Sequence, residues 1–129
     1  MDYQIHGYLI AKEYHFDIEN KCLFRLSTNS SEKNILFGAL FLNQTMLNVF
    51  LYLLQNGRDR SITKQELFSK VWEENDLSPS TQRLWQVLNG LNKKLSLLGM
   101  HDGMVHYFRG EGYRLTENDI ITLYRKDCH

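Results

Sequence analysis

The strongest constraint on the fold is a run of three segments with helical periodicity that ends in a glycine-rich hairpin pattern. Apolar residues recur at helical spacing over 44–56, 64–74 and 79–97, which predicts three amphipathic helices. Residues 103–115 then place Arg-Gly-Glu-Gly between two apolar runs, a pattern typical of a β-hairpin. A length of 129 residues fits one domain built on this order of elements.

Residues that can cap a helix stand before each of the three helical segments. Asn43 and Thr63 precede the first two, and their short side chains can accept hydrogen bonds from free amides of the first turn. For the third helix, Ser78 is the predicted N-cap and Pro79 the first helical residue, a position that suits proline. The helical part of the domain is therefore predicted to span 43–98.

The N-terminal residues show the two-residue period of strands. The apolar residues that alternate with polar neighbours are Tyr8, Ile10, Tyr14, Phe16 and Ile18. A further apolar run occupies 35–42. Residues 1–42 are therefore predicted to form an antiparallel sheet of three or four strands, whereas 117–129 is assigned to a C-terminal tail or linker.

The composition is that of an ordinary soluble globular protein, with 43% hydrophobic and 23% charged residues. The net charge is zero, which supports nucleic-acid binding less than a basic excess would. The longest apolar stretch, 35–42, is too short to span a bilayer, and the N-terminus lacks a secretory signal pattern. Cys22 and Cys128 have no zinc-like spacing; reduced thiols are preferred, with one disulfide as the alternative.

The third predicted helix has one face without acidic residues. Its leucine stripe, which must be buried, consists of Leu84, Leu88, Leu91 and Leu95. The opposite face carries Gln82, Gln86, Asn89 and Lys93, flanked by Arg83, Gly90 and Lys94. Gln and Asn can pair with adenine in the major groove of DNA, and Arg and Lys can contact phosphates or guanine. The face therefore predicts a DNA-binding surface, with an ordinary solvated helix face as the alternative.

Aromatic residues and the hairpin complete the candidate surface. Trp72 is predicted to lie in the core and Trp85 at the edge of the core. Tyr107 and Arg109 belong to the hairpin, whose cationic tip could contact phosphates or enter a minor groove. No arrangement typical of catalysis, phosphate loops or metal ligation is visible, so no enzyme activity, metal site or cofactor is predicted.

Three segments together resemble the DNA-binding domain of OmpR- and PhoB-type response regulators. They are KQELFSKVW at 64–72, LWQVLNGLNKKL at 84–95 and YFRGEGYRL at 107–115. The resemblance is closer to the N-terminal cytoplasmic domain of ToxR- and CadC-type regulators. It implies an α+β winged helix-turn-helix domain over 1–116, with an N-terminal antiparallel sheet, three helices and a C-terminal β-hairpin wing at 103–115.

The resemblance also implies a sequence-specific transcription regulator. The recognition helix at 79–97 would enter the major groove, and the wing would contact the minor groove or the backbone. Positions that often contact DNA in the family are occupied here by Gln82, Val87, Asn89, Gly90 and Asn92. Cations in the contacting region are Arg83, Lys93, Lys94 and Arg109. Asn92 stands where the family commonly has arginine, which predicts weak binding by an isolated domain.

The implied partners are double-stranded promoter DNA, a second copy of the chain on tandem half-sites, and RNA polymerase. The implied location is the cytoplasm, and a membrane would be involved only if a transmembrane segment followed in a longer protein. The alternative function is a winged-helix protein-interaction module or co-regulator with weak or no DNA binding, which the neutral charge and Asn92 favour.

Overall fold

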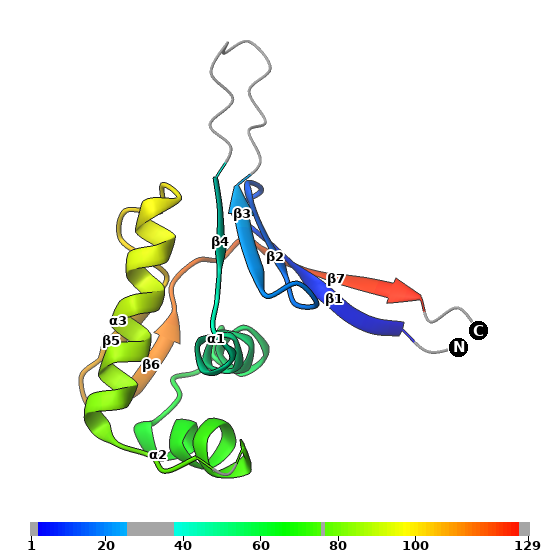
Figure 1. Ribbon diagram of the computed structural model, residues 1–129. Helices are drawn as coiled ribbons and strands as arrows, with labels where there is room; N and C mark the ends of the chain where they lie inside the picture. The colour runs from blue at the N-terminus through cyan, green and yellow to red at the C-terminus, as the bar shows by residue number, and fades with distance from the viewer. Residues whose placement is uncertain (1–2, 26–37, 76, 127–129) are drawn as a thin grey trace. The chain divides into compact units, whose positions relative to one another are not determined.

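The computed structural model describes residues 3–25, 38–75 and 77–126, and the chain divides into two compact units (Figure 1). The first, which we call the sheet unit, combines Met1–Leu42 with Glu117–His129. The second, the helical unit, is the continuous segment Asn43–Thr116. The helical unit is thus an insertion between the strands of the sheet unit.

The sheet unit is a five-stranded antiparallel sheet with the order β4-β3-β2-β1-β7. Its strands are β1 Tyr3–Ile10, β2 Tyr14–Asp17, β3 Cys22–Arg25, β4 Gly38–Phe41 and β7 Ile120–Lys126. The predicted alternation holds in the first two strands, where Tyr8, Ile10, Tyr14 and Phe16 are all buried. Residues 35–37 of the apolar run and Cys128 lie outside the described residues, and Cys22 is a buried free thiol.

Strand β7 lies in the segment that the sequence analysis assigned to a tail or linker. It pairs with β1 from Tyr3–Lys126 to Ile10–Ile120, with one irregularity between Ile5 and Gly7. The segment is rich in β-branched and aromatic residues, which favour a pleated, half-buried strand. Sequence periodicity shows such a preference but not the partner strand, which here lies more than a hundred residues earlier.

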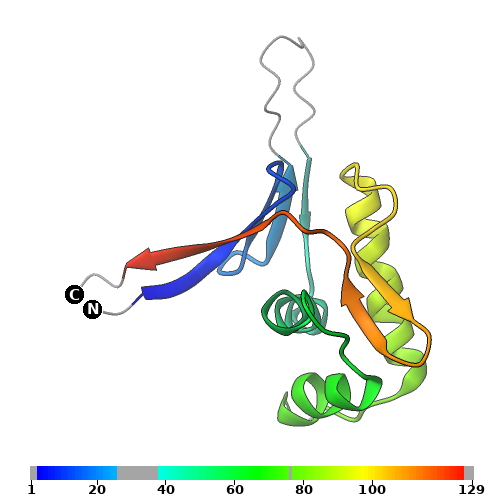
Figure 2. The ribbon, with the colours of Figure 1, turned by 180° about the vertical axis from the view of Figure 1, so that it is seen from behind.

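The helical unit contains three helices and the wing. They are α1 Gln44–Asn56, α2 Lys64–Leu67, α3 Thr81–Leu97, and the hairpin of β5 Val105–Phe108 and β6 Gly112–Leu115. Helix α2 continues through a π-helical turn, Phe68–Trp72, and a 3-10 turn, Glu73–Asn75. Figures 1 and 2 show α3 and the wing side by side. The α+β winged-helix architecture predicted from the sequence is confirmed.

The core of the helical unit is made by the predicted apolar stripes. Leu84, Leu91 and Leu95 of α3 are at most 1% exposed, and Leu88 is 6% exposed. Trp72 is 1% exposed, as predicted. No helix within the described residues is both long enough and apolar enough to cross a membrane.

Helix α3 begins two residues later than the sequence predicts. Ser80, not Ser78, is the N-cap: its side chain accepts a hydrogen bond of 3.0 Å from the backbone N–H of Arg83. Pro79 therefore lies before the helix rather than at its first position. Both serines have the same capping chemistry, so residue type could not distinguish them. The caps at Asn43 and Thr63 are confirmed by hydrogen bonds of 2.9 and 3.1 Å from Met46 and Glu66.

Candidate nucleic-acid interface

The exposed face of α3 carries the side chains that the sequence analysis selected. Gln82, Arg83, Gln86 and Lys93 are exposed, and Asn89 and Lys94 are half-buried. No acidic residue occurs in α3, whose cations are Arg83, Lys93 and Lys94. We call the stripe formed by Gln82, Asn89 and Lys93, with Gln86 beside it, the polar face of α3.

Two flanking residues of α3 lie toward the start of α1. Arg83 and Gln86 line a surface hollow of about 420 Å³ together with Asn43, Gln44, Thr45, Met46 and Val87. A Cβ at Gly90 would lie 3.2 Å from Cε of Met46, so Gly90 serves the close packing of α3 on α1. The family resemblance places Gly90 among positions that often contact DNA, and in this chain its lack of a side chain also serves helix packing.

The side chain of Asn92 forms hydrogen bonds with the backbone of the same chain. Its Oδ1 accepts hydrogen bonds of 3.1 Å from the backbone N–H groups of Met104 and Val105, and its Nδ2 donates to the carbonyl of Val105 at 2.8 Å. Val87 is only 7% exposed. The family resemblance placed both residues among positions that often contact DNA, but in this chain Asn92 ties α3 to β5 and Val87 packs in the core.

Trp85 is the clearest departure from the predicted surface. It is 63% exposed, whereas the sequence analysis placed it at the edge of the core. Its position explains the exposure, because it lies three residues after Gln82 and four before Asn89, next to both on the helix surface. The general burial of aromatic residues misled the prediction, and the helical wheel was the signal that could have corrected it.

The wing is anchored by a backbone bridge, and two of its tyrosine rings contact each other. Ile62 and Tyr113 exchange two backbone hydrogen bonds of 2.7 and 2.8 Å, which join β6 to the segment before α2. Tyr107 is 61% exposed, and its ring lies 5.1 Å from that of Tyr113. Burial, and then the neighbouring Tyr107, raise the pKa of Tyr113, so its hydroxyl stays protonated near neutral pH.

The tip of the wing presents Arg109, which is exposed. The neighbouring Arg114 instead places its guanidinium 4.1 Å from the centre of the Phe108 ring, a cation–π contact within the hairpin. Gly110 and Gly112 have φ angles of +80° and +130°, which allow the tight connection between β5 and β6. Arg109 is therefore held at the end of a short, well-defined turn.

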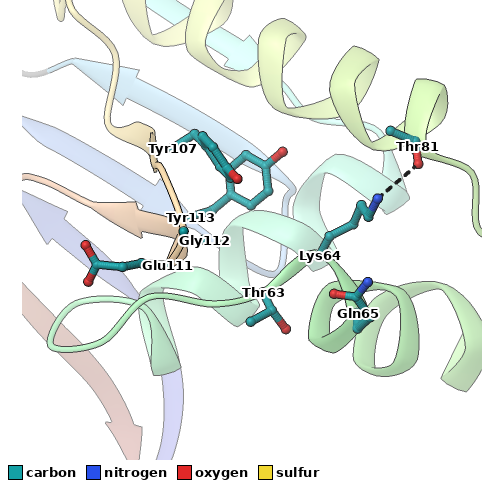
Figure 3. Close-up of a pocket in the computed structure, with 9 residues that line it drawn as sticks. Thr63, Lys64, Gln65, Thr81, Tyr107, Glu111, Gly112 and Tyr113 are labelled. Carbon is teal, nitrogen blue, oxygen red and sulfur yellow. Dashed lines mark hydrogen bonds between the residues drawn. The ribbon is translucent and has the colours of Figure 1, made fainter.

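A second hollow, the wing hollow, lies between the wing and the starts of α2 and α3 (Figure 3). Its volume is about 420 Å³, and it is lined by Thr63, Lys64, Gln65, Thr81, Tyr107, Gly110, Glu111, Gly112 and Tyr113. Nζ of Lys64 lies 3.5 Å from Oγ1 of Thr81. Glu111 points away from Lys64 in Figure 3, so the cation faces hydroxyl groups rather than this carboxylate.

Lys64 was missed by the sequence analysis. It stands at the beginning of a helix that was selected only for its buried face, and its proximity to Thr81 depends on how α2 and α3 pack. Tyr107, which was selected, lines the same hollow. The structure thus brings Tyr107 to the N-terminal end of α3 and adds a cation there.

Another cation near α2, Arg60, forms an ion pair with Glu66 of the same chain. Arg60 donates hydrogen bonds of 2.9 and 2.7 Å to the carboxylate of Glu66, which also accepts from the hydroxyl of Tyr52. The hydrogen bonds from Arg60 lower the pKa of Glu66 from 4.5 to about 2, although partial burial opposes the shift. Within 3–25, 38–75 and 77–126, no group of three or more His, Cys, Asp or Glu could hold a metal ion.

Comparison with known proteins agrees with this geometry. Residues 39–115 match the family described as transcriptional regulatory protein, C terminal. No curated protein matches the sequence of the chain. The fold is similar to the DNA-binding domain of Escherichia coli CadC, with a TM-score of 0.67 and 17% identity over 95% of this chain and 100% of that one.

Two response-regulator domains have similar folds. The DNA-binding domain of AdeR, solved in complex with an intercistronic region, has a TM-score of 0.61 and 20% identity over 83% of this chain and 97% of that one. The C-terminal domain of the nisin resistance regulator NsrR has a TM-score of 0.53 and 25% identity over 74% of this chain and 94% of that one. At these identities, the CadC and AdeR likenesses describe the fold alone.

Proposed function

We propose that this protein binds specific promoter sequences in double-stranded DNA. The chain belongs to the family of transcriptional regulatory protein C-terminal domains. Members of this family are DNA-binding modules and not enzymes. The observation that carries the proposal is the acid-free, exposed face of α3 beside the wing. In this arrangement α3 occupies the major groove and the wing contacts the adjacent backbone or minor groove.

The polar face of α3 supplies the contacts to bases. Gln82, Gln86 and Asn89 carry amides, which can bond to N6 and N7 of adenine in the major groove. Lys93 lies at the other end of the stripe, while Arg83 and Lys94 flank it and contact phosphates. The phosphate contacts hold the helix in register, and the amides distinguish the sequence.

The wing and the wing hollow supply further backbone contacts. Arg109 reaches from the hairpin tip, and Tyr107 and Lys64 offer a hydroxyl and a cation at the N-terminal end of α3. A phosphate group carries a negative charge and strong acceptor oxygens, which match this set of donors. We assign the wing hollow to one phosphate of the DNA backbone.

The distribution of charge reconciles this function with a net charge of zero. Between Asn43 and Thr116 the chain has nine Lys and Arg against seven Asp and Glu. The remaining residues have six Lys and Arg against eight Asp and Glu. The small basic excess of the helical unit is concentrated in α3 and the wing, where DNA binds.

The test is a fluorescence-anisotropy titration of the full chain with promoter DNA over a series of salt concentrations. Affinity should fall steeply with salt, because bound cations release counterions from DNA. The double variant Lys93→Glu, Arg109→Glu should abolish binding and keep the circular dichroism of the wild type. Lys70→Glu is the matched control, since Lys70 pairs with Glu74 outside α3 and the wing hollow.

Absence of binding at low salt, or binding that salt does not weaken, would contradict the proposal and favour the protein-interaction module. Homologous domains bind DNA, as the AdeR complex illustrates. Two copies on tandem half-sites, contact with RNA polymerase and a cytoplasmic location are further parts of the proposal. Analytical ultracentrifugation with and without a two-half-site duplex tests the pairing of copies, and a strict monomer on the duplex would refute it.

A further inference from the structure

Trp85 is a large apolar side chain beside the hydrogen-bonding groups of the polar face of α3. It is 63% exposed, and its neighbours one helical turn away are Thr81, Gln82 and Asn89. Removing an exposed indole from water contributes favourable free energy, so this side chain can add to the affinity for a partner that covers it. A partner that offers an apolar group between hydrogen-bonding groups would bury this side chain.

An A·T base pair offers this combination in the major groove. Adenine presents N7 as an acceptor and its N6 amino group as a donor, which a Gln or Asn amide can bind together. Thymine, on the other side of the same base pair, presents the C5-methyl group, which apolar side chains contact. An indole beside two amides therefore matches both halves of an A·T pair.

We propose that Trp85 contacts the C5-methyl group of thymine in A·T pairs whose adenine is bound by Gln82 or Asn89. The inference rests on the proposed function and deepens it, because it states which base pairs α3 selects. Sites with A·T pairs under the first three turns of α3 are bound most tightly.

The positions of the cations support A·T rather than G·C pairs at the centre of the site. Arg and Lys are the usual side chains that bind guanine. Arg83 lies toward the start of α1, where it lines a hollow with Asn43 and Met46. Lys93, the cation on the stripe itself, lies eight residues after Trp85, about two helical turns away. The turns around Trp85 thus carry amides and an indole.

The experiment begins with selection of preferred duplexes from a randomised pool by the full chain. Each thymine of the selected site is then replaced singly by deoxyuridine, which differs only in lacking the C5-methyl group. Loss of one buried methyl corresponds to about a fourfold loss of affinity, so at least one replacement should weaken wild-type binding by about that factor. The variant Trp85→Ala should lose on the order of tenfold on the thymine duplex and show no further loss at that replacement.

Leu97→Ala is the matched control. Leu97 is 78% exposed on the same helix, so this change also removes an exposed apolar group, and the variant should keep the sensitivity to deoxyuridine. Trp85→Phe should retain part of the sensitivity. Thermal unfolding of all three variants should match the wild type, because neither side chain is buried.

The outcomes separate the inference from the function on which it rests. If no sequence is enriched and no salt-dependent binding is found, the proposed function fails. If salt-dependent, selective binding is found but no thymine is sensitive, or Trp85→Ala keeps the wild-type sensitivity, the inference is overturned and the function stands. Loss of the sensitivity in Leu97→Ala would likewise overturn it.

Discussion

At the scale of single residues, Asn92 lies on the predicted recognition helix, but its amide is used within the chain rather than exposed for DNA. Its side chain uses both an acceptor and a donor to hold the start of β5. Arginine, which has five donors and no acceptor, cannot receive the N–H groups of Met104 and Val105. Asn92 therefore has a structural role in this chain, which an arginine at the same position could not fill.

The variant Asn92→Arg tests this role. Two backbone donors would lose their acceptor, so the free energy of unfolding should fall by about 2 kcal/mol. Urea denaturation measures the change. Asn89→Arg, one turn earlier on the polar face, is the control and should stay within about 0.5 kcal/mol of the wild type. An Asn92→Arg protein as stable as the wild type would refute the structural role.

The pair between Glu66 and Arg60 predicts a pH dependence. The folded protein holds the pKa of Glu66 at about 2, below its ordinary value of 4.5. A lowered folded-state pKa contributes stability that is present above 4.5 and is lost as the pH falls toward 2. Glu66→Gln should therefore lower Tm at pH 7, and the difference from the wild type should shrink between pH 4.5 and 2. A difference in Tm that is constant with pH would contradict the assignment.

Residue-scale prediction from sequence succeeded where periodicity determines the environment. The leucine stripe of α3 and Trp72 lie in the core as predicted, because a helical face repeats regularly. Trp85 was placed at the edge of the core but is exposed, and the structural role of Asn92 was not foreseen. The exposure of Trp85 could have been found from its place on the helical wheel, whereas the hydrogen bonds of Asn92 depend on tertiary contacts that one sequence does not display.

At the scale of elements, the wing is held to the helices by backbone contacts that leave no space for a side chain. Gly112 has a φ of +130°, and a Cβ there would meet the backbone carbonyl of Ile62. Gly110 has a φ of +80°, but a Cβ there would have nothing within 4 Å. A side chain at Gly110 would therefore cause backbone strain alone, whereas a side chain at Gly112 would cause both backbone strain and a steric clash.

The pair Gly110→Ala and Gly112→Ala tests the attachment of the wing. Gly110→Ala should cost about 1 kcal/mol, the ordinary penalty for a left-handed conformation without glycine. Gly112→Ala should cost at least about twice as much, because the Ile62–Tyr113 bridge must also open. Chemical denaturation of both variants measures the costs. Equal costs would show that the wing is not anchored at Ile62.

Lys64 tests whether the wing hollow binds a phosphate. Lys64→Gln should weaken DNA binding to a similar degree on all sequences and lower the slope of log affinity against log salt by about one. Salt titrations with a selected and an unrelated duplex measure both effects. Lys70→Gln, which removes the same charge outside the hollow, should leave the slope unchanged. An unchanged slope in Lys64→Gln would remove the hollow from the interface.

At the scale of the whole molecule, the order of the elements and the periodicity of apolar residues predicted the architecture. They did not predict that the C-terminal strand β7 pairs with the N-terminal strand β1. The sheet, helices and wing follow from the order of patterns in the sequence, and the family resemblance agrees with them. The pairing of β7 with β1 could not be predicted, because the two strands lie more than a hundred residues apart in the sequence. The candidate site was predicted on α3 and the wing tip, whereas Lys64 required the packing of α2 near α3.

Removal of residues 117–129 tests the importance of the pairing between β7 and β1. The helical unit ends at Thr116 and should keep its helical circular dichroism. Strand β1 would lose its neighbour β7 and expose an unpaired edge, which favours association between molecules. Size-exclusion chromatography should therefore show oligomers or aggregates. A monomeric truncated chain with the wild-type Tm would show that β7 is dispensable.

The pairing of Tyr3 with Lys126 also determines how the molecule responds to tension. Strands β1 and β7 are antiparallel neighbours, so a force applied to the two ends of the chain loads their ladder from one end. Each step breaks one pair of hydrogen bonds at a time, as in a zipper, rather than shearing all of them together. The helical unit lies between these strands in the chain, so it carries no load until the zipper has opened.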